Sequence, residues 1–363
     1  MKRGKRVSGV GAAGVVPKDL TNDRKVEHIA IIDRDRATDR RMHYFDQVRL
    51  THRALPELNL REVDPAVTFL GKRLSFPLLI SSMTGGDHAT VRTINRRLAE
   101  AAEAEGVAMA VGSQRVLFTH PAARASFDLR RCAPTTVLLG NLGAVQLNHG
   151  FGIKEARAAV DVLQADGLYL HLNPLQEAVQ PEGDTDFGGL AARIGALVKQ
   201  LPVPVLVKEV GAGLSRADAD LLVRAGVRHL DVAGSGGTSW SRIEAHRHGG
   251  ASGAALGVLY QDWGLPTPHC LKILSALRRK GVILIASGGL RSGLDLAKAV
   301  VLGASLGGLA APFLAPAQRS TRAVRAVIQR LRREYVTALF LLGQRTTLGM
   351  IGKTGLVESS PWT

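Results

Sequence analysis

The 363-residue sequence is short of cysteine, aromatic residues and long apolar runs, with two cysteines and 4% aromatic residues. Cys132 and Cys270 lie far apart and match no metal-binding or redox spacing, which excludes a disulfide framework and favours a reducing, cytoplasmic setting. No stretch approaches the roughly 20 consecutive apolar residues of a membrane-spanning helix. We therefore expect a cytoplasmic protein with no membrane partner.

Acidic residues are also scarce relative to basic ones. Asp and Glu number 31 against 47 Lys and Arg, so the formal net charge is +16 and an anionic partner is favoured. Much of the basic excess lies on predicted helices, at 277–280 and 329–334, without interleaved aromatic residues that could stack on bases. No nucleic-acid recognition module is recognisable. The composition therefore argues against a nucleic-acid partner and leaves a small phosphorylated ligand open.

The N-terminus is basic and glycine-rich, but it lacks the continuous apolar core of a signal peptide. We predict a flexible basic tail over residues 1–21 and one folded domain over residues 22–363. Transit peptides are also rich in arginine and poor in acidic residues, so the sequence leaves a targeting role for this tail open.

From about residue 75 onward, short apolar runs alternate with longer amphipathic ones. Short, almost continuously apolar runs are typical of parallel strands that are buried on both faces. The amphipathic segments between them predict helices, for example at 88–106 and at 215–226, where Ser215 is a plausible N-cap and Gly226 a helix stop. The eight strand candidates are residues 77–83, 107–113, 137–143, 168–173, 203–211, 227–234, 282–289 and 306–312.

Eight strand–helix units over this length predict an α/β fold, a (β/α)8 TIM barrel. Two regions interrupt the alternation. An N-terminal extension precedes the barrel, and its extended stretch at 67–77 is expected to cover the bottom. A long loop after the sixth strand, at 235–268, contains two of the three tryptophans and is interpreted as a lid or substrate loop.

The carboxyl ends of the strands carry the chemistry in such a barrel. After the seventh strand, "SGGLRSG" lets Gly289, Leu290 and Arg291 present backbone N–H groups to a phosphate, which we favour over a plain turn. Lys208 ends an apolar strand, where an unpaired charge would be costly. Because adjacent strand residues face opposite sides, Glu209 is a poor partner for it. Lys208 is therefore expected to face a ligand, as a charge for a flavin ring or as a Schiff-base nucleophile.

The stretch "HLNPLQE" at 171–177 ends the fourth strand in ligand-binding groups instead of turn residues. Magnesium takes oxygen ligands, often one or two carboxylates completed by water and substrate phosphates. Glu177 is therefore a candidate Mg²⁺ ligand, with Gln176 beside it. Near the N-terminus, "RKVEH" places Arg24, Lys25 and His28 together, although by composition this is only more basic tail.

Taken in order, several strings resemble the type 2, FMN-dependent isopentenyl-diphosphate isomerases. They are "RKVEH", "FLGKRLSFPLLISSMTGG", "VGSQR", "GNLGA", "HLNPLQE", "KEVG", "AGSGGTSWSRIEAHR", "SGGLRSGLDLAKAVVLGA" and "TALFLLGQRTTLGM". Each string is modest alone, but the ordered set spans residues 24 to about 350. One departure is Ser235, where the family pattern suggests alanine.

The resemblance implies a barrel enzyme that interconverts isopentenyl and dimethylallyl diphosphate, with no net redox change, in isoprenoid biosynthesis. It implies reduced FMN and Mg²⁺ as cofactors and NADPH as the reductant of FMN. The implied FMN-binding residues are Ser82, Met83, Thr84, Ser113, Asn141, Lys208, Thr238, Gly289, Leu290, Arg291, Ala310 and Ala311. The implied substrate-binding residues are Arg24, Lys25, His28, Ser113, Gln114, Arg115 and Gln176. The implied catalytic residues are Gln176, His171 and Lys208, and Glu177 is the implied metal ligand.

An alternative keeps the FMN barrel but assigns net oxidation, as in the 2-hydroxy-acid oxidases. Those enzymes use a His–Arg pair for a carboxylate substrate, and His246 with Arg247 could imitate it, although their order and setting differ. A homo-oligomer, from dimer to octamer, is expected only because symmetric assemblies are common among soluble enzymes.

Overall fold

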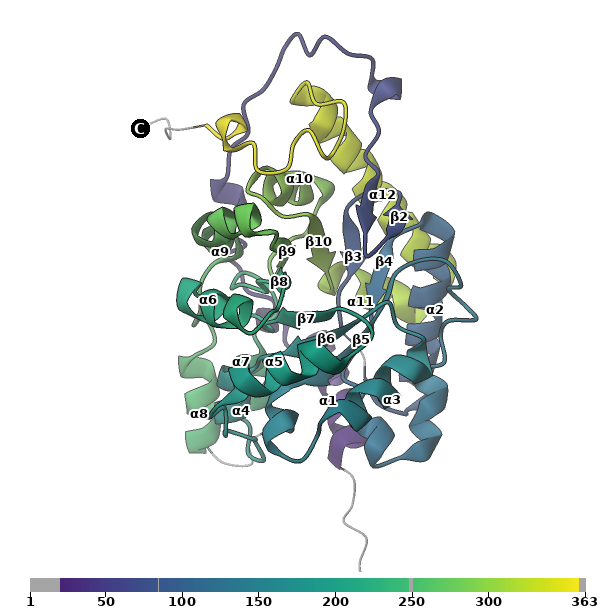
Figure 1. The fold of residues 1–363 in the computed structure, drawn as a ribbon, viewed down its shortest axis with the longest axis vertical. Coiled ribbons are helices and arrows are strands. Elements are labelled where there is room, and N and C mark those ends of the chain that lie inside the picture. The colour runs from purple at the N-terminus through teal and green to yellow at the C-terminus, as the bar shows by residue number, and fades with distance from the viewer. Residues whose placement is uncertain (1–19, 84, 248–250, 359–363) are drawn as a thin grey trace, which may run out of the picture.

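A computed structural model describes residues 20–83, 85–247 and 251–358. Eight parallel strands close into a barrel in the order β10-β3-β4-β5-β6-β7-β8-β9, which confirms the predicted (β/α)8 fold (Figure 1). Seven lie within the predicted runs, β6 begins one residue before its run, and all eight are shorter than predicted. They are β3 (Leu78–Ile80), β4 (Ala108–Ala110), β5 (Leu138–Gly143), β6 (Gly167–His171), β7 (Val205–Lys208), β8 (His229–Asp231), β9 (Ile283–Ser287) and β10 (Leu306–Leu309).

Helices surround this barrel. The predicted N-cap of α6 is confirmed, since the Ser215 side chain accepts a hydrogen bond from the Asp218 N–H. Gly226 follows this helix with a φ of 98°, a left-handed conformation that favours glycine. The helices are α1 (Leu20–Arg34), α2 (Ala89–Glu105), α3 (Ile153–Leu163), α4 (Pro174–Val179), α5 (Leu190–Gln200), α6 (Arg216–Arg224), α7 (Trp240–Ala245), α8 (Ala251–Leu259), α9 (Thr267–Leu274), α10 (Gly293–Val301), α11 (Ala311–Arg319) and α12 (Thr321–Leu341).

The lower half of the barrel interior is apolar. Alternate strand residues point inward, and those nearer the amino ends of the strands form one buried cluster. An antiparallel hairpin, β1 (Val67–Phe69) and β2 (Lys72–Leu74), packs Phe69 and Leu74 against this cluster. The prediction that this stretch covers the bottom is thereby confirmed. The inward-facing residues of the cluster are Leu79, Ala108, Ala110, Leu139, Tyr169, Leu206, Ile285 and Leu306.

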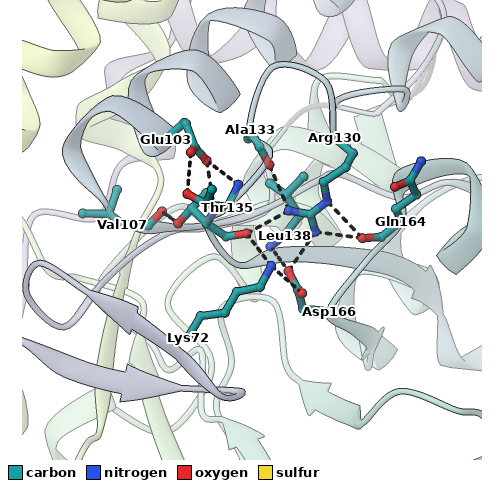
Figure 2. A network of polar contacts seen from close by, with 10 residues as sticks. Lys72, Glu103, Val107, Arg130, Ala133, Thr135, Leu138, Gln164 and Asp166 are labelled. Atoms are coloured by element: carbon teal, nitrogen blue, oxygen red, sulfur yellow. Dashed lines mark hydrogen bonds and ion pairs between the residues drawn. The ribbon is translucent and has the colours of Figure 1, made fainter.

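A polar network ties the hairpin to the amino ends of β5 and β6 (Figure 2). Asp166 is its centre: its carboxylate lies 2.7 Å from the Lys72 ammonium and 2.8 Å from the Arg130 guanidinium. It also accepts the N–H of Leu138, at 2.9 Å. The network closes the bottom of the barrel with paired charges.

Two residues further along the strands, the inward-facing positions become polar. Because the side-chain period of a strand is two, these residues follow the apolar layer on the same face. The polar layer consists of Ser81, Asn141, His171, Lys208, Asp231 and Ser287. It places chemically active groups at the rim where the strands end.

The long connection after β8 is not a plain loop, because it contains α7 and α8 and runs into α9. The segment after α1 also reaches the rim. The side chain of Arg40, 6% exposed, donates to the carbonyls of Gln261 and Gly211. In Figure 1, α1, α4, α7 and α8 lie toward one end of the molecule, and β2 and the C-terminal segment toward the other. Among the described residues, no helix is long and apolar enough to cross a membrane.

Candidate active site

A cavity of about 220 Å³ opens at the carboxyl ends of the strands. Most of the predicted site residues line it, although they come from widely separated parts of the sequence. The predicted FMN-binding residues on its wall are Ser82, Met83, Ser113, Asn141, Lys208, Thr238, Gly289, Leu290, Arg291, Ala310 and Ala311. The predicted substrate-binding and catalytic residues on its wall are His28, Ser113, His171, Gln176 and Lys208.

Two of the predicted diphosphate ligands do not line this cavity. Gln114 is fully buried in the wall, where its amide donates to the Ala159 carbonyl at 2.8 Å and accepts the Asn141 N–H at 2.9 Å. Arg115 forms an ion pair with Asp184 at 3.0 Å. In this geometry Gln114 fixes the backbone of Asn141, and its role toward a diphosphate stays a prediction. A role for Arg115 toward a diphosphate stays a prediction.

The side chains of three predicted site residues lie outside what the structure describes. Thr84 lies outside the described residues. Arg24 and Lys25 are on α1, and the structure describes the course of this helix but not those two side chains. The helix does bring its next turns to the cavity, since His28, Ile29 and Ile32 line the wall.

Glu177 is buried beside the cavity, and its carboxylate is already hydrogen-bonded. Oε1 accepts the Asn173 amide at 2.7 Å, and Oε2 accepts the Gln180 amide and the Asp184 N–H, both at 2.8 Å. Among the described residues, no group of three His, Cys, Asp or Glu side chains could hold a metal ion. A lone carboxylate such as Glu177 can serve Mg²⁺ where substrate and water supply the other oxygen ligands.

Lys208 and Glu209 point to opposite sides, as the strand alternation predicts. Lys208 is 7% exposed and lines the cavity, and its ammonium donates to the Glu209 carbonyl. The Glu209 carboxylate turns into the following loop, where Oε2 accepts the N–H groups of Val210 and Gly211 at 2.6 Å. Glu209 thus shapes the loop that also lines the cavity, while Lys208 faces the ligand space.

His171 is oriented by Asn141. The Asn141 amide nitrogen donates to the Val111 carbonyl, so the amide oxygen faces the His171 Nδ1 at 2.8 Å. Nδ1 therefore carries a proton in this arrangement. Both residues line the cavity, so the pair presents an imidazole of defined orientation to it.

Glu244, which lies on α7 with 0% exposure, was not among the predicted site residues. Its carboxylate accepts the Gln176 amide at 2.7 Å, pairs with the His28 Nε2 at 3.2 Å and pairs with the Arg247 guanidinium at 2.6 Å. Burial by itself raises the pKa of Glu244, but the hydrogen bond and charge of His28, together with the hydrogen bonds from Gln176 and Arg247, lower it to about 2. Glu244 thus joins α1 and α4 over the cavity. Its place in "RIEAHR" was the only available signal.

The predicted phosphate turn after β9 has an unusual backbone. Gly288 and Gly289 both adopt a left-handed φ, near 89° and 87°, and a side chain on Gly288 would collide with the Gly234 carbonyl. The N–H of Arg291 is donated to Asp295, which caps α10, and its guanidinium pairs with Asp39. Of the predicted backbone donors, Gly289 and Leu290 have no recorded acceptor among the described residues.

These features fit a flat ligand with a phosphate tail. The hydroxyls of Ser81 and Ser82 are buried on the cavity wall and have no hydrogen-bond partner among the described residues. Ala310 and Ala311 bring the positive N-terminus of the nine-residue α11 to the same cavity. A buried cation, two unpaired hydroxyls and a helix N-terminus in one cavity match the chemistry of FMN.

The rival His–Arg pair does not reach the cavity wall. His246 bonds to Asp35 at 2.7 Å, and Arg247 is held by Glu244, Glu182 and Glu27. Neither side chain is therefore available for a carboxylate substrate in this geometry.

The model of the FMN-dependent dehydrogenase family matches residues 21–124 and 176–354. Solved structures with a similar fold include a flavocytochrome b2 variant with sulfite bound (TM-score 0.65, 18% identity, covering 89% of this chain and 78% of that one). Another is an oxidised active mutant of (S)-mandelate dehydrogenase (TM-score 0.63, 18% identity, 93% and 92% coverage). At this identity the likeness shows the fold alone.

Curated relatives are much closer in sequence. The isopentenyl-diphosphate delta-isomerase of Paracoccus zeaxanthinifaciens is 56% identical over 338 residues, which cover 92% of this chain and 97% of that protein. The same enzyme of Hydrogenovibrio crunogenus is 53% identical, over 88% of this chain and 93% of that protein. That of a Nostoc species is 46% identical, over 89% of this chain and 92% of that protein. The chain therefore belongs to the isopentenyl-diphosphate delta-isomerase family, within the FMN-dependent dehydrogenases, and is an isomerase.

Proposed function

We propose that the protein interconverts isopentenyl diphosphate and dimethylallyl diphosphate by a 1,3-allylic proton shift, using reduced FMN and Mg²⁺. The observation that carries the proposal is 56% identity to a named isomerase over nearly the whole chain. The convergence of the predicted residues on one cavity supports it. We also propose NADPH as the reductant of FMN and isoprenoid biosynthesis as the setting.

Different residues of the chain would bind the diphosphate and its metal ion. Arg24 and Lys25 on α1 would bind the diphosphate, and His28 from the same helix lines the cavity. Glu177 would contribute one oxygen to Mg²⁺, and the diphosphate and water would complete the coordination. Anchoring the remote charged end supplies binding energy that orients the alkene at the reacting end.

The FMN site would use both ends of the cavity. Gly289, Leu290 and the N-terminus of α11 would bind the phosphate through backbone N–H groups. Lys208 and Asn141 would lie against the polar edge of the ring. When bound, reduced FMN supplies an electron-rich ring that stabilises positive charge on a neighbouring carbon and can hold a proton.

Around the reacting carbons, hydrogen bonds would hold the polar side chains in place, and apolar side chains would exclude water. The Gln176 amide is held from two sides, since it donates to Glu244 at 2.7 Å and accepts from Asn173 at 3.2 Å. His171 presents an imidazole whose Nδ1 proton is held by Asn141. Ile29 and Ile32 of α1 cover the cavity with apolar surface, which protects a carbocation-like transition state from water.

The test is to incubate purified protein with isopentenyl diphosphate, FMN, Mg²⁺ and NADPH without oxygen. We expect dimethylallyl diphosphate to form, and its formation to stop with a chelator and resume with added Mg²⁺. A protein that binds FMN but forms no isomer would refute the proposal. A parallel incubation with 2-hydroxy acids in air tests the oxidase alternative, for which peroxide would be the product.

Three other expectations remain proposals. Cys132 and Cys270 are both free thiols, which supports a reducing compartment such as the cytoplasm. The expectation of a homo-oligomer, from dimer to octamer, is still based only on the general frequency of symmetric assemblies. The tail at 1–21 lies mostly outside the described residues, and its role stays a prediction.

A further inference from the structure

One buried carboxylate lies inside the barrel next to the cavity but does not line it. Asp231 ends β8, has 0% exposure and is the register partner of Lys208 at the end of β7. Residues paired in register on neighbouring strands point to the same face of a sheet, which here is the barrel interior. Asp231 was not among the predicted site residues.

The surroundings of Asp231 suit a negatively charged group. Its carboxylate accepts the Ser287 hydroxyl at 2.6 Å, the Tyr169 hydroxyl at 3.1 Å and the Ala233 N–H at 3.3 Å. Burial raises the pKa of Asp231, and the charge of Lys208 is the first influence that opposes this. The three donors and the nearby cation favour the ionised carboxylate, but burial outweighs them and the pKa of Asp231 stays above its usual value.

Asp231 and Glu209 are two buried carboxylates that interact with the charge of Lys208. Among the ion pairs of the described residues, none joins Lys208 directly to a carboxylate, and its ammonium donates to the Glu209 carbonyl. The Glu209 carboxylate also interacts with Lys208, but it is turned into the loop and held by backbone N–H groups. Asp231 is thus the interior charge that balances the lysine.

We propose that Asp231 is a positioning residue for Lys208, whose charge it partly neutralises so that the cavity does not bind the reduced, anionic form of FMN too strongly. Ser287 adds a second link, since it donates to Asp231 and lines the cavity itself. The inference rests on the proposed function, because it takes Lys208 to face FMN.

The first measurement compares the Kd of oxidised and reduced FMN for the wild type and for Asp231→Asn. The substitution removes one negative charge with little change of shape, so the uncompensated Lys208 should favour the anionic reduced form. We expect the ratio of the two Kd values to shift about tenfold toward reduced FMN, which equals about 30 mV for a two-electron couple. Tyr169→Phe is the matched control, because it removes one donor and keeps the charge. Its ratio should stay within about twofold of the wild type.

The second measurement needs no FMN. In the apoprotein, Lys208→Met leaves Asp231 without its cation and should lower the Tm by about 3 °C, whereas the double variant with Asp231→Asn should recover most of this loss. Additive effects of the two substitutions would overturn the pairing. An unchanged Kd ratio in an FMN-binding Asp231→Asn protein would overturn the effect on FMN. Wild-type protein that binds no FMN would refute the proposed function and the FMN part of this inference. The Tm values of the apoprotein variants would then still decide whether Asp231 and Lys208 are paired.

Discussion

The two ends of the barrel differ in some of their buried polar groups. At the amino ends of the strands, Asp166 is paired with Lys72 and Arg130 (Figure 2). The Thr136 hydroxyl there donates to the Val107 carbonyl at 2.7 Å. At the carboxyl ends, the Ser81 and Ser82 hydroxyls are buried and have no partner among the described residues.

This difference indicates that polar groups at the amino ends contribute to stability, whereas those at the carboxyl ends contribute to ligand binding. A satisfied polar network stabilises the end that contains it, whereas an unsatisfied buried group costs free energy until a ligand arrives. We therefore expect substitutions at the bottom to change stability and substitutions at the rim to change binding and turnover. Active sites commonly retain such locally unfavourable groups for function.

The largest expected contrast is between two histidines. His171 ends β6 at the rim, whereas His229 begins β8 at the bottom and packs edge-on against Phe69, with ring centroids 5.9 Å apart. His171→Ala should lower kcat about 1,000-fold, in the range of a lost proton-transfer group, with little change in Tm. His229→Ala should leave kcat within about twofold and cost about 1 kcal/mol of unfolding free energy. Steady-state kinetics and thermal unfolding of both variants measure this, and equal losses of kcat would abolish the contrast.

A smaller effect is expected within the bottom itself. Asp166→Asn removes the charge that pairs with Lys72 and Arg130, so the free energy of unfolding should fall by about 2–3 kcal/mol while turnover stays unchanged. The matched control is Asp64→Asn, whose exposed pair with Arg73, at 3.2 Å, should contribute less than about 0.5 kcal/mol. Denaturant titrations of the two variants measure the difference, and a large loss in the control would contradict it.

The same pair predicts a pH dependence. Burial raises the pKa of Asp166, but hydrogen bonds from Lys72, the Leu138 N–H and Arg130 outweigh it and lower the pKa below its usual value. The folded-state pKa is therefore below that of the unfolded chain. The ionised Asp166 carboxylate therefore stabilises the folded protein fully above about pH 4. This stabilisation is lost as the pH falls through the folded-state pKa of Asp166. The stability gap between wild type and Asp166→Asn should narrow over that acidic range, and a constant gap would argue against this origin.

The smallest effects are expected for two hydroxyls of opposite character. Ser81→Ala removes an unpartnered buried hydroxyl, so the apoprotein should be unchanged or more stable by up to about 0.5 kcal/mol, while FMN binding weakens several-fold. Thr136→Val removes a hydroxyl that is bonded at the bottom and should cost about 1 kcal/mol without affecting FMN binding. Thermal unfolding and FMN titration measure both. A destabilised Ser81→Ala apoprotein would mean that this hydroxyl already has a partner.

Much of the fold follows from local patterns in the sequence. Eight short apolar runs predicted all eight strands, and the turn residue Gly226 with the N-cap Ser215 predicted the ends of α6. The strand alternation also predicted that Lys208 and Glu209 would face opposite sides. These features depend on neighbours within a few residues, so periodicity and capping chemistry are sufficient to predict them.

The contacts of charged and amide side chains at the rim were less predictable. Gln114 carries the same chemistry as Gln176, yet it is turned into the barrel wall while Gln176 lines the cavity. Glu244 stood in a recognised string and Asp231 in a predicted strand, both without an assigned role, and both are central in the structure. Each of these side chains had several possible partners in the sequence.

By itself, then, the sequence determined the barrel, the order of its strands along the chain and the kinds of group that reach its rim. Only the tertiary structure decided which of those groups meet. Asp231 and Lys208 become register partners because β7 and β8 pair in one particular register, and Glu244 reaches His28 because α1 crosses to α7. The physical reason is that hydrogen bonds and charge pairs act over a few ångströms, so a partner's identity depends on position in space and not on separation along the chain.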